Sequence, residues 1–212
     1  MKKNTYGEFP VQIIVNGRAA LTIMTHAESA AEREELVLGA LFTERVVASL
    51  DDVESVLIND AQASVVTKDP YTILLSRKTV LAGCGGASSF LDNGKLGRVT
   101  CGYTVSEEVC TAAADKIPES VWYFAGLFSA DGTLICSADD ITAQNAADRI
   151  IGSALKAGVN PAETFAVLRG NCTVETMRKI IIAKIPVLVA AGDITLAALE
   201  TASEAGVRII RG

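Results

Sequence analysis

The chain has 212 residues, half of them apolar, and a formal net charge of −6. This length accommodates one sizeable core or two modest ones. The negative charge argues against a nucleic-acid-binding protein, because phosphate recognition needs clustered Lys and Arg. It leaves open a small anionic ligand held by backbone amides or by one arginine.

No membrane span or secretory signal is predicted. The apolar segment 179–191 is interrupted by Lys184 and Pro186, so it indicates a buried helix followed by a buried strand. The basic residues Lys2 and Lys3 are not followed by an apolar stretch, which excludes a signal peptide of the usual form. We therefore expect a cytoplasmic protein that does not enter a membrane.

The cysteines favour free thiols in a reducing compartment. They are odd in number, scattered and without CxxC spacing: Cys84, Cys101, Cys110, Cys136 and Cys172. The only histidine is His26, so a structural zinc site is not expected. A zinc nucleoside deaminase is excluded, because it needs a Pro-Cys-x-x-Cys motif beside its His-x-Glu or Cys-x-Glu pair, and the chain has no Pro-Cys-x-x-Cys.

The first 80 residues predict a small α+β domain. A strand over 11–15, the turn Asn16-Gly17 and a returning arm over 20–24 form a hairpin. Ser29 and Glu32 have the spacing of a capping box and open a helix. Short strands are predicted near 53–58, 62–67 and 71–76. The strands of this domain are expected to pair in an antiparallel manner.

Residues 81–103 are rich in glycine and are assigned to a loop and linker. Cys84 lies between Gly83 and Gly85, which give the thiol little steric cover. Backbone amides in such a loop can converge on an anion or a thiolate. Two interpretations remain open. Cys84 is either a reactive thiol or an incidental cysteine in an interdomain loop.

Residues 104–212 predict an α/β domain in which strands alternate with helices. The segment Thr104-Val105-Ser106-Glu107 caps a helix that continues to about Lys116. Strands over 121–129 and 134–137 and a helix over 143–157 follow. Strands over 165–168, 186–190 and 207–210 then alternate with helices over 173–183 and 195–205. Strands joined by single helices indicate parallel crossovers.

Polar residues gather at the predicted helix starts. Asp140 precedes a helix that contains Asn145. The polar residues at this helix start either cap the helix or form a polar cluster directed at a ligand. Arg169-Gly170-Asn171 joins a strand to a helix, and Thr195 occupies the equivalent place after the next strand. Ligands of open α/β sheets bind at such strand ends, where Arg169 is suited to phosphate. An ordinary connecting loop is the alternative.

These segments, in this order, resemble the FdhD/NarQ family of formate dehydrogenase accessory sulfurtransferases. The resemblance covers nearly the whole chain. It rests on segments 10–17 and 34–44, Gly83-Cys84-Gly85, Asp140, Asn145-Ala146, Asp148, Gly152, segment 184–189 and Arg211-Gly212.

The resemblance implies a second domain with a cytidine-deaminase-like, three-layer α/β/α fold that lacks zinc. It implies a homodimer that binds the guanine dinucleotide form of the molybdenum cofactor, for which GDP is a mimic. Cys84 would carry sulfur from a cysteine desulfurase to that cofactor for formate dehydrogenase. The implied cofactor-binding residues are Gly83, Gly85, Asp140, Asn145, Arg169, Gly170, Asn171 and Thr195.

Several positions depart from the family pattern. Ala87 stands where a second loop cysteine is usual, and Ala143-Gln144 replaces an Arg-His pair before Asn145. Asn171 replaces an arginine, and Ile194 replaces a proline. Segment 119–123 replaces the usual Thr-Gly-Gly-x-His. The alternative function is therefore a diverged, non-catalytic nucleotide-binding, pterin-binding or protein-interaction module.

Overall fold

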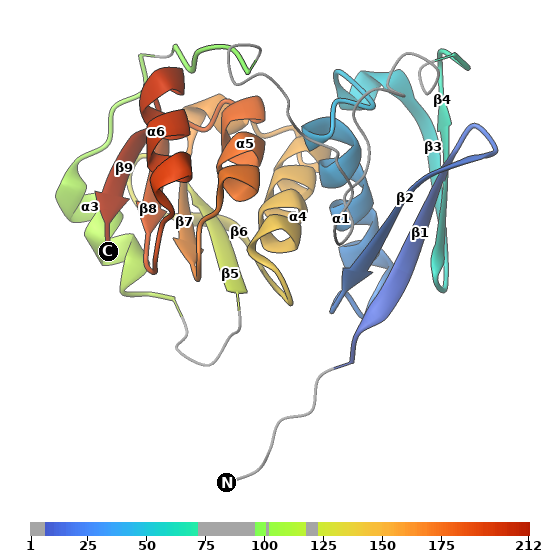
Figure 1. Ribbon diagram of the computed structural model, residues 1–212, viewed down its shortest axis with the longest axis horizontal. Helices are drawn as coiled ribbons and strands as arrows, with labels where there is room; N and C mark the ends of the chain where they lie inside the picture. The colour runs from blue at the N-terminus through green and yellow to red at the C-terminus, as the bar shows by residue number, and fades with distance from the viewer. Residues whose placement is uncertain (1–6, 72–95, 101, 118–122) are drawn as a thin grey trace, which may run out of the picture.

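The computed structural model describes residues 7–71, 96–100, 102–117 and 123–212 (Figure 1). Its N-terminal part is a four-stranded sheet in the order β2-β1-β4-β3. The strands are β1 (Phe9–Val15), β2 (Arg18–Thr25), β3 (Val53–Asn59) and β4 (Gln62–Thr67). The predicted hairpin is confirmed, and its turn places Asn16 and Gly17 at φ 50° and 76°.

The prediction of an antiparallel N-terminal unit is wrong in one respect, because β1 and β4 pair in parallel. The cause is helix α1 (Ala30–Thr43), which crosses the inner face between the two hairpins. The hairpin β3–β4 therefore returns with β4 beside β1. The turn η1 (Leu50–Asp52) leads into β3. Of the predicted strand 71–76, only Tyr71 lies within the described residues, and it is in a turn.

The C-terminal part is a five-stranded sheet in the order β6-β5-β7-β8-β9. Its elements are α3 (Glu107–Ala114), β5 (Tyr123–Phe128), β6 (Leu134–Asp140), α4 (Ala143–Lys156), η3 (Pro161–Glu163), β7 (Phe165–Arg169), α5 (Val174–Ile182), β8 (Val187–Ala190), α6 (Leu196–Ala205) and β9 (Arg208–Arg211). The strands β7, β8 and β9 are parallel, which confirms the predicted crossovers. Helix α3 begins after Ser106 rather than at Thr104, because the Ser106 hydroxyl accepts from the Val109 amide.

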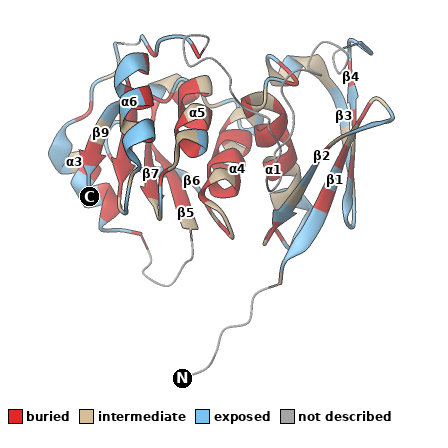
Figure 2. Cartoon of the chain, in the orientation of Figure 1, coloured by how far each residue is buried: buried red, intermediate tan, exposed pale blue. Residues whose placement is uncertain are grey.

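The fold is a mixed α/β architecture with helices on both faces of the larger sheet. One core packs α4, α5 and α6 on one face, and another packs α3 on the opposite face. Figure 2 colours buried residues red along the strands of the larger sheet and on α4 and α5. The more specific likeness to a cytidine-deaminase fold stays a prediction. Among the described residues, no helix has the length and apolar character to cross a membrane.

Helices α1 and α4 lie side by side between the two sheets (Figure 1). A Cβ atom on Gly39 would lie 1.8 Å from the carbonyl oxygen of Asp148, and one on Gly152 would lie 1.9 Å from that of Glu35. Only glycine allows two helix backbones to approach this closely. This helix contact attaches the N-terminal sheet to the larger one. The division of the chain into two domains joined by a linker at residues 81–103 stays a prediction.

Candidate functional site

The carboxyl ends of four strands and the N-termini of three helices meet at one edge of the larger sheet. Because β5 is antiparallel to both β6 and β7, strands β6 to β9 all run in one direction. Helices α4, α5 and α6 each begin just after one of these strands. This is where open α/β sheets bind ligands. The described site residues all lie at this edge: Asp140, Asn145, Arg169, Gly170, Asn171 and Thr195.

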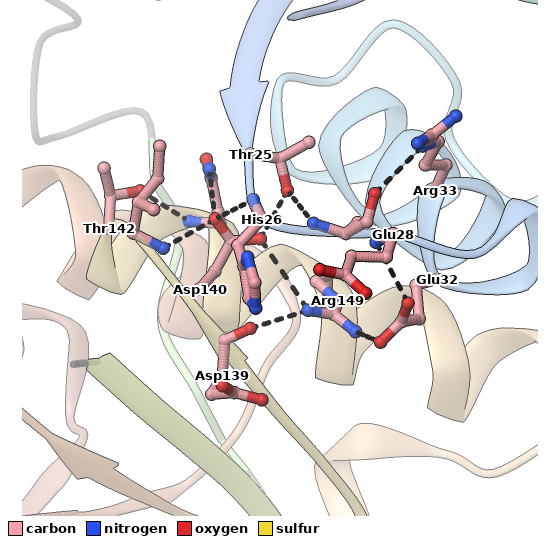
Figure 3. Close-up of polar contacts among 12 residues, drawn as sticks. Thr25, His26, Glu28, Glu32, Arg33, Asp139, Asp140, Thr142 and Arg149 are labelled. Carbon is pink, nitrogen blue, oxygen red and sulfur yellow. Dashed lines mark hydrogen bonds and ion pairs between the residues drawn. The ribbon is translucent and has the colours of Figure 1, made fainter. Parts of the chain in front are cut away.

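Asp140, labelled in Figure 3, belongs with Asn145 to a buried polar cluster. The Asp140 carboxylate is only 2% exposed and accepts from the Thr25 hydroxyl at 2.5 Å and the His26 amide at 3.2 Å. The Asn145 amide donates to that carboxylate at 3.0 Å and to the Met24 carbonyl at 2.7 Å. These two side chains therefore connect the end of β2 to the start of α4. Thr142, not Asp140, is the N-cap of α4.

Sequence reasoning missed Arg149, which completes this cluster (Figure 3). It is buried, and its guanidinium donates to the Asp139 carbonyl at 2.6 Å and the Glu32 carboxylate at 2.8 Å. Burial raises the pKa of Glu32, but hydrogen bonds from Ser29 and the charge of Arg149 outweigh it and leave that pKa below its usual value. The i, i+4 spacing of Asn145 and Arg149 was the available signal, since it places both on one helix face.

The loops after β7 and β8 form one unit. The Cys172 amide donates to the Asp193 carbonyl at 2.8 Å, and the Thr195 amide donates to the Cys172 carbonyl at 3.1 Å. A Cβ atom on Gly192 would lie 2.6 Å from the Gly170 carbonyl oxygen. Gly170 has φ 115°, and a Cβ there would strike the Tyr123 ring at 2.5 Å. Asn171 and Thr195 are thus held together on the surface of this edge.

Arg169 is the cation of this unit. It is half-buried, and its Nη2 atom donates to the Ile117 carbonyl at a long 3.4 Å. Its Nε atom is buried and has no hydrogen-bond partner among the described residues. The guanidinium therefore retains hydrogen-bonding capacity that none of the described residues uses. Thr173 occupies the N-cap position of α5, but its side chain makes no capping bond.

The predicted thiol site, Gly83-Cys84-Gly85, lies outside the described residues, as does Cys101. The other three cysteines are described, and all are free thiols. Burial raises the pKa of Cys172 to about 12 and that of Cys136 to about 11. Burial also raises the pKa of Cys110. A thiol must ionise to act as a nucleophile, so these three are unsuited to sulfur chemistry near neutral pH.

The purified protein is expected to contain no stoichiometric zinc. Within the part of the chain that the structure describes, no group of three or more His, Cys, Asp and Glu side chains is arranged to hold a metal ion. Elemental analysis of metal-replete protein checks this expectation. One zinc per chain would contradict it and would revive the comparison with zinc deaminases.

The amino-acid sequence is similar to those of known proteins. A profile of the FdhD/NarQ family matches residues 6–211. The sulfur carrier protein FdhD of Sulfurisphaera tokodaii is 31% identical over 84% of this chain and 73% of its own length. The protein of that name from Anaeromyxobacter dehalogenans (strain 2CP-1 / ATCC BAA-258) is 28% identical over 95% of this chain and 81% of its own.

The fold has a counterpart in the crystal structure of a formate dehydrogenase accessory protein from Desulfotalea psychrophila. The TM-score is 0.73 at 17% identity, over 97% of this chain and 82% of that one. The likeness in fold agrees with the sequence match, which extends across both sheets. The chain therefore belongs to the FdhD/NarQ family.

Proposed function

We propose that this protein is an accessory sulfur carrier in the maturation of a molybdenum or tungsten formate dehydrogenase. The observation that carries the proposal is the family match over residues 6–211. Relatives that are 31% and 28% identical to this chain bear the name sulfur carrier protein. The proposed partners are a cysteine desulfurase as sulfur donor and formate dehydrogenase as recipient.

Cys84 is the proposed sulfur-carrying residue. Sulfur transfer requires a thiolate that a second protein can reach. The three described cysteines lack this property, because burial raises the pKa of each thiol. Of the remaining two, Cys84 lies between glycines, and its motif matches the family's cysteine loop. The elimination supports Cys84 ahead of the other cysteines.

The loading step needs only the two proteins. The Cys84 thiolate attacks the outer sulfur of a cysteine persulfide on the desulfurase. A new S–S bond forms on Cys84, the S–S bond of the donor breaks, and the donor cysteine leaves as a thiolate. Donor and acceptor exchange one sulfur atom without an external oxidant or reductant, so the reaction can be reconstituted from purified components.

The proposed recipient substrate is the guanine dinucleotide form of the molybdenum cofactor, bound at the sheet edge described above. Arg169 offers a donor that no described residue occupies, and Gly170, Asn171 and Thr195 lie in the two joined loops. Asp140 and Asn145 are already hydrogen-bonded within the protein, so we assign them to holding this edge in place. Gly83 and Gly85 would bring the Cys84 thiol to the substrate.

Mass spectrometry of the intact protein tests the sulfur-carrier proposal. The full chain is incubated with a cysteine desulfurase and L-cysteine, and the thiols are then trapped by alkylation. One added sulfur atom per chain, located on the peptide that contains Cys84, is expected. A chain that acquires no sulfur would favour the alternative of a non-catalytic binding module, which the replacement of the second loop cysteine by Ala87 motivates.

GDP is expected to bind weakly, and Arg169→Ala is expected to abolish the remaining affinity. The chain lacks the family's Arg-His pair before Asn145 and its arginine at position 171. Each lost charge-assisted hydrogen bond removes on the order of 1.5–3 kcal/mol. Two such losses weaken binding by a factor of about hundreds or more. Calorimetric titration of the purified chain with GDP measures both effects.

Arg208→Ala is the matched control for Arg169→Ala. Arg208 also donates to a backbone carbonyl, that of Val105, but it lies at the start of β9 and so at the opposite edge of the sheet. Its replacement should leave GDP binding unchanged. Tight GDP binding that survives Arg169→Ala would place the nucleotide on other groups.

A further inference from the structure

A row of contacts, here called the edge strip, runs along the ligand edge of the larger sheet from Tyr123 to Arg211. It crosses the neighbouring strands β5, β7, β8 and β9 in that order (Figure 1). Three adjacent ring atoms of Tyr123 lie within 3.5 Å of the position that a Cβ atom on Gly170 would take. Gly192 packs on Gly170 in turn, and the Arg211 Nη1 atom donates to the Gly192 carbonyl at a long 3.4 Å.

Tyr123 and Arg211 project from the same face of the sheet. Successive side chains of a strand point to opposite faces. Tyr123 shares its face with Ala125, which belongs to the core beneath α4, α5 and α6. Arg211 shares its face with Ile209, which packs against the same core. Arg169 instead reaches a carbonyl just after α3, on the other face, and borders the middle of the edge strip from there.

Both ends of the edge strip are accessible, and its middle carries no side chain. Tyr123 is half-buried, whereas the residues that follow it in β5 are all buried. Arg211 is exposed, and no described carboxylate forms an ion pair with its guanidinium. Between these ends, Gly170 is half-buried and Gly192 is exposed. The edge strip thus presents an aromatic ring and a guanidinium on either side of bare backbone.

We propose that the edge strip binds a nucleotide, with the planar base stacked on Tyr123 and the phosphates at Arg211. Aromatic side chains stack bases, and a guanidinium pairs with phosphate oxygens through parallel hydrogen bonds. Three strand spacings separate β5 from β9, so the backbones of Tyr123 and Arg211 stand roughly 14 Å apart. An extended nucleoside diphosphate, with base and terminal phosphate at opposite ends, can bridge the two side chains. The two glycines leave room for its sugar.

This assignment rests on the proposed function, since it orients the nucleotide part of the cofactor at the edge described above. It states which part of the ligand each residue meets. Tyr123 should matter only to ligands that carry a base, whereas Arg211 should matter to every ligand that carries phosphate. A comparison of GDP with inorganic pyrophosphate separates the two roles.

Ligand-observed NMR at millimolar GDP or inorganic pyrophosphate measures binding to the full chain. Tyr123→Leu should weaken GDP binding by about tenfold or more, because the base loses its stacking surface, and should leave pyrophosphate binding unchanged. Tyr123→Phe keeps the ring and should bind GDP as the unmodified chain does. Arg211→Gln should weaken the binding of both ligands by about tenfold or more, because a charge-assisted hydrogen bond is lost.

Tyr103→Leu is the matched control. Tyr103 is also half-buried, but it packs against the core beneath α3, on the other face of the sheet. Its replacement should leave both affinities unchanged, and circular dichroism should show unaltered folding for every variant. Equal losses of GDP and pyrophosphate binding in Tyr123→Leu overturn the proposal. Unchanged binding in Arg211→Gln overturns it as well, and so does an unmodified chain that binds no GDP.

Persulfide loading distinguishes a failure of this proposal from a failure of the proposed function. Every variant should load sulfur from a cysteine desulfurase as the unmodified chain does, because the loading step does not involve the nucleotide. Sulfur loading without GDP binding would overturn the edge strip and leave the sulfur carrier standing. The expected GDP results without sulfur loading would keep the edge strip as the site of a nucleotide-binding module.

Discussion

Cys84→Ser is expected to abolish persulfide loading by a cysteine desulfurase. A serine hydroxyl cannot accept sulfane sulfur, and burial raises the pKa of Cys110, Cys136 and Cys172. The thermal midpoint should change little, because Cys84 lies between glycines in a predicted loop, where little apolar burial is expected. Intact-mass analysis after desulfurase treatment measures the loading, and differential scanning calorimetry measures the stability.

Cys101→Ser is the control for this experiment, because Cys101 is the other cysteine whose placement the structure does not describe. It should load sulfur as the unmodified chain does. Loading that persists in Cys84→Ser and disappears in Cys101→Ser would transfer the carrier role to Cys101. A marked fall in the thermal midpoint of Cys84→Ser would instead identify Cys84 as a packed core residue.

Lys179→Met is expected to lower the free energy of unfolding by about 3–5 kcal/mol at neutral pH, because it leaves a buried carboxylate without its cation. The Lys179 ammonium on α5 lies 2.9 Å from Asp148 on α4 and 2.9 Å from Glu44 after α1. It also donates to the Thr43 hydroxyl at 3.1 Å. This cluster joins α1, α4 and α5. Urea denaturation measures the loss.

The loss should depend on pH. Burial raises the pKa of Asp148 to about 6, although Lys179 and Thr43 oppose the shift. Burial also disfavours the charged Lys179, but Asp148 and Glu44 together keep its pKa above the usual value. A raised carboxyl pKa contributes stability below the unfolded-state pKa of 3.8, and that contribution is lost as the pH rises through the folded-state value. Without Lys179 the pKa of Asp148 rises further, so the deficit should be small near pH 4, where the carboxyl is protonated in both proteins, and should grow as the pH rises above 6.

Lys156→Met is the matched control, since Lys156 also forms an ion pair, with Glu34, but is 44% exposed. Exposed pairs contribute about 1 kcal/mol or less, so the loss of stability in Lys156→Met should be correspondingly small. Equal effects of Lys156→Met and Lys179→Met would contradict the assignment of the Lys179 cluster as a buried connection between the two sheets.

The sequence by itself determined the local structure and the edge at which the site lies. The hairpin turn at Asn16-Gly17 and the capping box of Ser29 and Glu32 depend on residues a few positions apart, and both are present. The alternation after residue 143 predicted parallel strands, because a single helix between two strands returns the chain in the same direction. That direction places Arg169 and Thr195 at one edge without knowledge of any long-range contact.

Only the tertiary structure decided what the polar residues at this edge contact. Thr25 and Asp140 are 115 residues apart, and Glu32 and Arg149 are 117 apart. Local periodicity carries no information about such pairs. The parallel pairing of β1 with β4 and the close approach of α1 and α4 at Gly39 and Gly152 arise in the same way. They depend on how two separately patterned halves pack together, and this packing brings buried charges to partners that no sequence spacing indicates.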